Sequence, residues 1–312
     1  CNVMKMELDE RLMIPERIRI PVLGGIWYRY LCKRKREQIR NVPIQSLSLN
    51  REKRETKLIF TLTSFPDRID SVQYTLRTLF MQSMKPDRVI LWLAKDEFKN
   101  FEFPESICEF QKVGLEIRYC DNLFGHKRYY KLIAEQKSDE CIMMFDDDIL
   151  FPKYMVERLY DVWKNNQNCI VCDRGQLLTF DGEKILNPGR WTTNSKVGLT
   201  KPSFRILASP GGGCLLPPNA LYVDACNQEL IKKYAIKTGD IWLMFMAVQN
   251  DTPIMRTYQY HRIFILSEEQ QTVQLGREAI YQGRYMKTFE ELSKAYPHAY
   301  ENMLQEAKNE AE

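Results

Sequence analysis

Three consecutive carboxylates end a short apolar run in the middle of the sequence. The run Cys141–Phe145 is followed directly by Asp146, Asp147 and Asp148. Five apolar residues bounded by charge are typical of a strand that is buried on both faces in a parallel sheet. Because ligands of open α/β sheets bind at the carboxyl ends of the strands, this pattern predicts a polar site directly after Phe145.

A divalent cation is the partner that these acids favour. Adjacent carboxylates repel one another, and Mg²⁺ or Mn²⁺ takes oxygen ligands from one or two carboxylates and from substrate phosphates. Alternatively, the acids only favour the dipole of a following helix, which Pro152 and the apolar spacing from Met155 to Trp163 predict. Since a helix start needs one acid and the chain has three, we favour a metal site for a nucleotide diphosphate.

Two other enzyme classes that place acids or phosphates after an apolar strand are disfavoured. A P-loop nucleotidase requires a Gly-Lys dipeptide, and the sequence contains none. A phosphatase of the D-x-D-x-T kind requires Thr where this chain has Leu150.

Length and composition are those of a globular protein. The chain has 312 residues, of which 44% are hydrophobic, enough for one large α/β domain or two smaller ones. The longest apolar run, Ile241–Val248, is far shorter than the roughly 18 residues of a membrane span. The nine cysteines lack paired zinc spacing, and several lie in apolar strands, so we expect reduced core residues and a cytoplasmic setting.

Positive charge is concentrated at the front of the chain. Residues 1–57 carry 14 Lys and Arg against seven Asp and Glu, whereas the whole chain has a net charge of +4. Within this region, Ile14–Arg36 interleaves apolar, aromatic and basic residues. Such a segment favours either an anionic membrane surface, here the inner face of the cell membrane, or an arm packed on its own domain or on a partner subunit. Nucleic acid is disfavoured because no binding motif accompanies the charge.

From residue 57 onward, apolar runs and helical patterns alternate. The alternation predicts a largely parallel sheet with helices on both faces, an α/β fold. The expected strands are Leu58–Leu62, Val89–Leu93, Leu115–Tyr119, Cys141–Phe145, Cys169–Cys172, Gln176–Phe180 and Thr252–Tyr258. The expected helices lie at Val72–Phe80, after Gly125, after Pro152, at Tyr222–Tyr234, from Thr238 or Asp240 to Val248, and through the last fifty residues, with contacts from Phe289, Leu292 and Leu304. Ser209–Pro218 is too rich in Gly and Pro for a helix or a central strand.

With these elements in order, residues 57–262 resemble a GT-A-fold glycosyltransferase. The likeness is to the family-2-like transferases of bacterial surface-polysaccharide biosynthesis, such as those for capsule and lipopolysaccharide. It rests on the motifs Thr61–Arg68, Gln82–Leu93, Phe145–Ile149, Gly211–Pro217 and Gly239–Trp242. The resemblance implies a GT-A (Rossmann-like) catalytic domain at 57–265, with a nucleotide-sugar half at 57–150 and an acceptor half at 151–265. Residues 1–56 would form a basic arm and residues 266–312 a helical extension.

The resemblance also implies a donor site. Thr63, Phe65, Pro66 and Arg68 would lie near the nucleotide, and Arg68 can bind phosphate or carbonyl oxygens. Lys127 and Lys131, one helical turn apart, would face the diphosphate together, unless they form a solvated basic face. The triplet would be the D-x-D element, with Asp146 and Asp148 on the metal and Asp147 on the sugar or ribose.

The same resemblance assigns an acceptor side. Asp240, at the start of a late helix, would be the general base, with a plain helix cap as the alternative. Gly211, Gly212, Gly213 and Trp242 would contact the sugar and the acceptor. His261 would be a third metal ligand or a packed core residue, whereas His126 and His298 show only surface or cap positions.

The implied activity is a metal-dependent, inverting transfer of a hexose from a nucleotide-diphosphate sugar, with a UDP-sugar favoured. The acceptor would be a hydroxyl on a glycan or a lipid-linked glycan. A retaining transferase differs only in stereochemistry. A catalytically silent carbohydrate- or nucleotide-binding protein of the same fold is the other hypothesis, and the intact acids argue against it.

Overall fold

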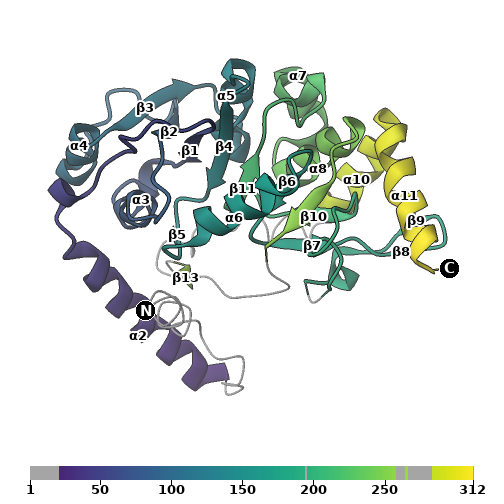
Figure 1. Cartoon of the computed structure of the whole chain (residues 1–312), viewed down its shortest axis with the longest axis horizontal. Coiled ribbons are helices and arrows are strands. Elements are labelled where there is room, and N and C mark those ends of the chain that lie inside the picture. Colours follow the sequence, from purple (N-terminus) through teal and green to yellow (C-terminus); the bar gives the residue numbers. More distant parts are fainter. Residues whose placement is uncertain (1–20, 194, 258–263, 266–282, 312) are drawn as a thin grey trace.

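The computed structural model describes residues 21–193, 195–257, 264–265 and 283–311. Within them lies a seven-stranded sheet in the order β12-β6-β11-β4-β1-β2-β3, flanked by helices (Figure 1). Every strand is parallel to the others except β11, which runs antiparallel to both β4 and β6. The expected α/β fold with a mostly parallel sheet is therefore confirmed. The strands are β1 (Lys57–Thr63), β2 (Arg88–Ala94), β3 (Leu115–Cys120), β4 (Glu140–Phe145), β6 (Ile170–Cys172), β11 (Gly212–Leu216) and β12 (Ile254–Arg256).

Helices cover both faces of the sheet because the strands bury both sets of alternating side chains. In β1, Leu58, Phe60 and Leu62 pack in one apolar cluster, while Ile59 packs in the other. The first cluster is closed by α3 (Val72–Phe80), α4 (Glu105–Lys112) and α6 (Met155–Lys164). The second is closed by α5 (Tyr130–Glu135), α8 (Gly239–Gln249), α10 (Arg284–Ala295) and α11 (Pro297–Ala311).

Strand β11 corrects one expectation from the sequence. The Gly- and Pro-rich stretch at 209–218 contains a central strand, because only its first part forms a turn. Gly212 bonds back to Ser209, and the apolar residues from Cys214 onward then pair with β4. The register shifts at Gly213, whose φ of +103° suits glycine, so the strand starts with a bulge.

Smaller elements also differ from the expected ones. The single helix expected at Tyr222–Tyr234 is divided into a 3₁₀ turn η5 (Val223–Cys226), a short helix α7 (Gln228–Leu230) and a π-helical turn η6 (Ile231–Ala235). The break occurs where the Asn227 side chain accepts from the backbone of Glu229 and Leu230 and starts a new turn. Short antiparallel pairs join β7 (Gly175–Leu177) to β10 (Ile206–Ala208), β8 (Phe180–Asp181) to β9 (Lys184–Ile185), and β5 (Ile149–Leu150) to β13 (Phe264–Ile265).

The front of the chain forms a long helix, α2 (Pro21–Arg40), that projects from the body (Figure 1). Its second half contacts the domain through buried Cys32 and Ile39, and the connection to β1 buries Ile44 and Leu47. Part of the expected arm thus packs on its own domain. No helix that the structure describes is long and apolar enough to cross a membrane, and the eight described cysteines are free.

The topology gathers the polar loops at one edge. The carboxyl ends of β1, β2, β3, β4, β6 and β12 point to the same edge, and antiparallel β11 begins there. Gly212 lies opposite Phe145 in the register, so the Gly-rich turn lies beside the acidic triplet.

Candidate active site

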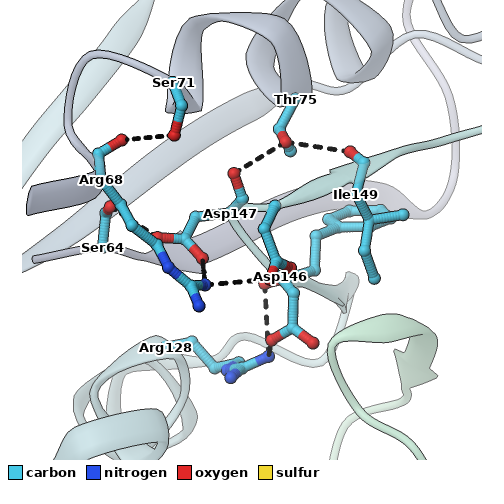
Figure 2. Close-up of polar contacts among 10 residues, drawn as sticks. Ser64, Arg68, Ser71, Thr75, Arg128, Asp146, Asp147 and Ile149 are labelled. Atoms are coloured by element: carbon cyan, nitrogen blue, oxygen red, sulfur yellow. Dashed lines mark hydrogen bonds and ion pairs between the residues drawn. The ribbon is translucent and has the colours of Figure 1, made fainter. Parts of the chain in front are cut away.

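Two carboxylates of the triplet share one arginine. Arg68 Nη1 donates to Asp147 at 2.9 Å and to Asp148 at 3.0 Å, and the Ser64 hydroxyl donates to Asp147 at 2.6 Å (Figure 2). The side chains of Arg68, Asp147 and Asp148 are only 8 to 12% exposed. Strand β1 and the 3₁₀ turn η2 (Pro66–Arg68) therefore hold the end of β4 through a largely buried ion-pair cluster.

The turn that carries the triplet is also fixed through its backbone. The Thr75 hydroxyl in α3 lies 2.9 Å from the carbonyl oxygens of both Asp147 and Ile149 (Figure 2). The Asp146 N–H donates to the Gly211 carbonyl at 2.7 Å on the opposite side. The turn is thus held between α3 and the start of β11.

Asp146 differs from its two neighbours. Its side chain is 37% exposed and accepts from Arg128 Nη1 at 2.5 Å. A Cβ at Gly211 would overlap with the Asp146 carboxylate, so the carboxylate can occupy this position only because residue 211 is glycine. Asp146 is therefore the member of the triplet that faces the open edge, with Arg128 from the 3₁₀ turn η3 (Phe124–Arg128) beside it.

This arrangement differs from the expected pairing of Asp146 with Asp148. Strand alternation ends with β4 at Phe145, and in the following turn Asp147 and Asp148 both face Arg68. Asp146 alone faces Arg128 among the described ion pairs of the triplet. Three carboxylates are balanced by two guanidinium groups, which leaves one negative charge for a further cation.

The pKa of Asp147 is raised from its ordinary value because burial opposes the charged form, although Arg68 and Ser64 lower it. The pKa of Arg68 is affected first by burial, which lowers it, but Asp147 and Asp148 outweigh this and the net pKa is raised. The Arg68 charge therefore offsets part of the cost of burying the Asp147 carboxylate, and the Asp147 and Asp148 charges offset the cost of burying Arg68.

The triplet fits a divalent cation that takes most of its ligands from outside the protein. Among the described residues, no group of three His, Cys, Asp or Glu side chains converges to hold a metal. Mg²⁺ typically binds one or two carboxylates and completes its shell with waters and phosphate oxygens. The exposed Asp146 carboxylate suits this mode, and His261, the expected third ligand, lies outside the described residues.

The loop that follows β1, residues 64–68, lies beside this ion-pair cluster. The Phe65 ring lies under the Arg68 guanidinium, with 5.0 Å from Cζ to the ring centroid, and Pro66 starts the 3₁₀ turn that carries Arg68. The Thr63 hydroxyl donates to the Trp92 carbonyl at 2.7 Å, which ties β1 to β2. Phe65 and Pro66 therefore position Arg68, Phe65 through its ring and Pro66 by starting the turn.

The shared helical face expected for Lys127 and Lys131 is wrong. Lys127 lies in η3 and Lys131 in α5, with the non-helical Tyr129 between them. The Lys127 side chain is 4% exposed and its Nζ lies 3.4 Å from Glu97. The cation that contacts the exposed carboxylate is instead Arg128, which the sequence analysis did not single out.

Asp240 lies in the first turn of α8, near the Gly-rich turn. Its Oδ1 accepts from the Ile241 N–H at 3.0 Å, and its Oδ2 accepts from the Tyr285 hydroxyl. Asp240 and Pro210 line the same small cavity. The next residue, Gly211, lies against Asp146, so the Gly-rich turn lies between the two carboxylates. Burial raises the pKa of Asp240, while Tyr285, the Ile241 N–H and the charge of Arg128 lower it. Arg128 thus acts electrostatically on both Asp146 and Asp240.

The expected acceptor contact of Trp242 is wrong. Its side chain is fully buried, and its indole N–H donates to the Ala225 carbonyl at 3.2 Å. On α8, it points into the core rather than to the sheet edge. The glycines at 211–213 pack closely instead: added Cβ atoms would meet Asp146 at Gly211, Arg174 at Gly212 and Met155 at Gly213.

His126 also differs from the surface or cap position expected for it. The ring is fully buried, and it bonds to the Ala235 carbonyl through Nε2 at 2.8 Å and to the Tyr129 hydroxyl through Nδ1. Burial lowers its pKa to about 4, so the imidazole is neutral. It joins η3 to the segment before α8, whereas His298 is exposed and contacts Asp251.

Comparison of structures finds matches among solved proteins, whereas comparison of sequences finds none. No family model matches the sequence, and no curated protein matches it. The chain is similar in structure to a mannosyltransferase from Pyrobaculum calidifontis, solved in complex with GDP-Man and Mn²⁺, with a TM-score of 0.44 and 7% sequence identity. The match covers 75% of this chain and 64% of that one, so the chain spans less than two thirds of the neighbour's length.

Proposed function

We propose that this protein is a metal-dependent glycosyltransferase. It moves a sugar from a nucleotide-diphosphate donor to a hydroxyl of a glycan or a lipid-linked glycan, with inversion at the anomeric carbon. The observation that supports this most is the pair of carboxylates at one sheet edge: exposed Asp146 at the end of β4, and Asp240 at the start of α8 across the Gly-rich turn.

The donor side follows from the charges around Asp146. Arg128, next to Asp146, would bind an oxygen of the donor diphosphate, because guanidinium groups bind phosphates strongly. Mg²⁺ or Mn²⁺ held by the exposed Asp146 carboxylate would neutralise the charge that develops on the departing nucleoside diphosphate. Asp147 and Arg68 would maintain the shape of the turn, since both are buried in their own ion pair.

The chemical step needs a base on the far side of the anomeric carbon from the phosphate. Asp240 would take the proton of the acceptor hydroxyl as the acceptor oxygen bonds to the anomeric carbon. The bond between that carbon and the donor phosphate oxygen breaks, and the nucleoside diphosphate leaves with the electron pair. The products are the glycosylated acceptor, the nucleoside diphosphate and a proton on Asp240.

The basic helix α2 would bring the enzyme to a lipid-linked acceptor. Its described second half exposes Lys33, Arg34 and Arg40, and anionic lipid surfaces attract such clusters. We therefore propose peripheral binding to an anionic membrane through α2.

A panel of nucleotide sugars tests the proposed function. Release of nucleoside diphosphate is measured for each donor with Mg²⁺ or Mn²⁺, and UDP-hexoses are the first to try. We expect turnover with at least one donor, its loss in excess chelator, and its recovery when metal is added back. Binding of a nucleotide sugar without turnover, with every acceptor class supplied, would indicate the silent binding protein instead. NMR of the product anomer distinguishes inversion from retention.

A further inference from the structure

The first turn of α10 contacts the first turn of α8, although the two are far apart in the sequence. The Tyr285 hydroxyl donates to Asp240 Oδ2. One turn further on, the Thr238 and Thr288 hydroxyls lie 3.1 Å apart, and both residues are buried. The Trp191 ring contacts the Tyr285 ring edge-on, with centroids 6.2 Å apart. Tyr285 is thus held between two segments and directed at Asp240.

The rest of α10 is fixed to the domain by its apolar face. The Phe289 ring packs edge-on against Phe245 of α8, with centroids 4.9 Å apart, and both rings are buried. At the end of the helix, the Tyr296 ring contacts buried Trp242, and its hydroxyl donates to Asp224 at 3.1 Å. Figure 1 shows α10 and α11 packed beside α8. Since α10 is attached at both ends, Tyr285 is a fixed donor rather than a free surface side chain.

We propose that Tyr285 is a positioning residue for Asp240, so that the C-terminal helices complete the active site. The inference rests on the proposed function, because it gives Tyr285 its effect through the general base. Tyr285 fixes the side-chain rotamer of Asp240 and favours its ionised form. With Oδ1 held by the Ile241 N–H and Oδ2 by Tyr285, the carboxylate keeps one orientation and uses its remaining lone pairs for the acceptor proton.

The hydrogen bond from Tyr285 affects the ionisation of Asp240 because few groups around Asp240 favour its charged form. Burial opposes the carboxylate, and the groups that favour it are Tyr285 from α10, the Ile241 N–H of α8 and the Arg128 guanidinium of η3. Burial raises the pKa of both Tyr129 and Tyr285, and the nearby Asp240 charge raises each of them further. A hydrogen bond to an ionised group is stronger than one between neutral groups. Loss of the Tyr285 hydroxyl therefore raises the pKa of Asp240 further.

The test is the pH dependence of turnover in Tyr285→Phe, which keeps the ring and removes the hydroxyl. The rate must rise with pH as Asp240 ionises, so in the variant this rise moves to higher pH. On the acidic side of the rise we expect turnover to fall by about tenfold, with the donor KM unchanged. The matched control is Tyr296→Phe, which loses a tyrosine–carboxylate hydrogen bond at the C-cap of α10 but should leave the pH profile where it is.

A second measurement does not depend on activity. The Asp240 side-chain carboxyl is followed by ¹³C NMR against pH in the wild type, in Tyr285→Phe and in Tyr296→Phe, with each melting curve recorded. We expect the Asp240 titration to move to higher pH only in Tyr285→Phe. An unmoved pH profile and an unmoved titration in a folded Tyr285→Phe protein would overturn the proposal while leaving the proposed function intact. A wild type without turnover on any nucleotide sugar would overturn the proposed function and this role of Tyr285 together.

Discussion

Arg68 is the cation that pairs with two buried carboxylates of the acidic triplet. It forms ion pairs with two carboxylates, Asp147 and Asp148, in a cluster that is nearly closed to solvent. Removing one partner of a buried ion pair leaves an uncompensated charge, which costs far more than the pair itself contributes. The cluster is therefore needed for the stability of the β4 turn as well as for its shape.

We predict that Arg68→Met lowers the free energy of unfolding at neutral pH by about 3–5 kcal/mol. The folded-state pKa of Asp147 is already raised, and loss of Arg68 raises it further. A raised carboxyl pKa gives stability that is present at low pH and is lost as pH rises through the folded-state pKa. The deficit should therefore shrink as the pH is lowered, which urea unfolding at several pH values measures. Arg88→Met, which breaks the more exposed pair with Glu116, should cost about 1 kcal/mol or less and serves as the control; equal losses in both variants would contradict the prediction.

Asp240→Asn tests the general base directly. Asparagine keeps the size of the side chain and can still accept one of the two hydrogen bonds, from the Ile241 N–H or from the Tyr285 hydroxyl, through its single oxygen, but it is not a proton acceptor. We expect turnover to fall by about 10²- to 10⁴-fold while donor affinity stays close to the wild-type value. Turnover and calorimetric donor binding are the measurements. A variant with near-normal turnover would show that another group takes the acceptor proton.

Of the residues in the candidate site, the acids are predictable from the sequence, whereas their contacts with Arg128 and Tyr285 are not. The triplet at the end of a strand is predictable because the apolar run and the charges are adjacent in the chain. The roles of Arg128 and Tyr285 are not predictable, because the contact of Arg128 with Asp146 and that of Tyr285 with Asp240 depend on how distant segments pack. The burial of Trp242 depends in the same way on the rotation of α8, a helix that is apolar all round and so gives no periodic signal.

At the element scale, the start of β11 places a glycine against the end of β4. The sheet register brings Gly212 opposite Phe145, so Gly211 lies against the carboxylate that faces the open edge. Glycine is thus required at position 211 because the residue before β11 packs closely against the residue after β4.

Gly211→Ala should reduce turnover by about 10²-fold, since a small misplacement of a reacting or binding group can cost that much. The added Cβ would overlap with the Asp146 carboxylate and displace it from Arg128. The stability loss should be modest because the carboxylate can rotate away. Gly189→Ala, where an added Cβ meets nothing within 4 Å, is the matched control and should behave as wild type. Unchanged turnover in Gly211→Ala would argue against a role for Asp146 in donor binding.

For helix α2, a charge reversal is a cleaner test of membrane binding than deletion, because deletion of the arm would also remove buried Ile44 and Leu47. Each basic residue near an anionic surface contributes about 1 kcal/mol. We expect Lys33→Glu with Arg34→Glu to weaken sedimentation with phosphatidylserine vesicles, and added salt to weaken wild-type binding. Reversal of exposed Lys232 and Lys233 is the control. If both double variants sediment like the wild type, α2 is not the membrane contact.

Elements with a regular period were predictable, and irregular ones were not. Strands β1 to β4 and helices α3, α6 and α8 lie where the apolar spacing indicates. Strand β11 was missed because its glycines and prolines lie at its two ends, and its short apolar centre is decided by pairing with β4 and β6. The sequence predicts one helix at Tyr222–Tyr234 because nothing in its apolar spacing marks the interruption, which depends on a single Asn227 cap.

At the scale of the whole molecule, the C-terminal helices are attached through a charged contact as well as through their apolar faces. Glu306 of α11 accepts from the Ser203 hydroxyl and from the Phe204 N–H, and it lies 3.5 Å from the Arg205 guanidinium, which is 6% exposed. This contact joins α11 to the segment that enters β10.

Glu306→Ala should lower the free energy of unfolding by about 2–4 kcal/mol. The substitution removes the acceptor of the Ser203 hydroxyl and the Phe204 N–H, and it leaves the buried Arg205 guanidinium with fewer partners. Glu301→Ala, on an exposed position of the same helix, should change it by less than about 0.5 kcal/mol. Chemical denaturation of both variants provides the comparison. Similar stabilities would mean that the apolar face alone holds α11 in place.

The strand order has a consequence for how the protein is made. Strand β11 lies between β4 and β6, although both of these precede it in the chain, and β12 pairs outside β6. While the chain leaves the ribosome, the first four strands can associate, but β6 has no neighbour in the sheet until Leu216 has emerged. The lateral side of β4, the strand that leads to Asp146, therefore stays unpaired until β11 has been synthesised, a period in which unpaired strands are exposed to other chains.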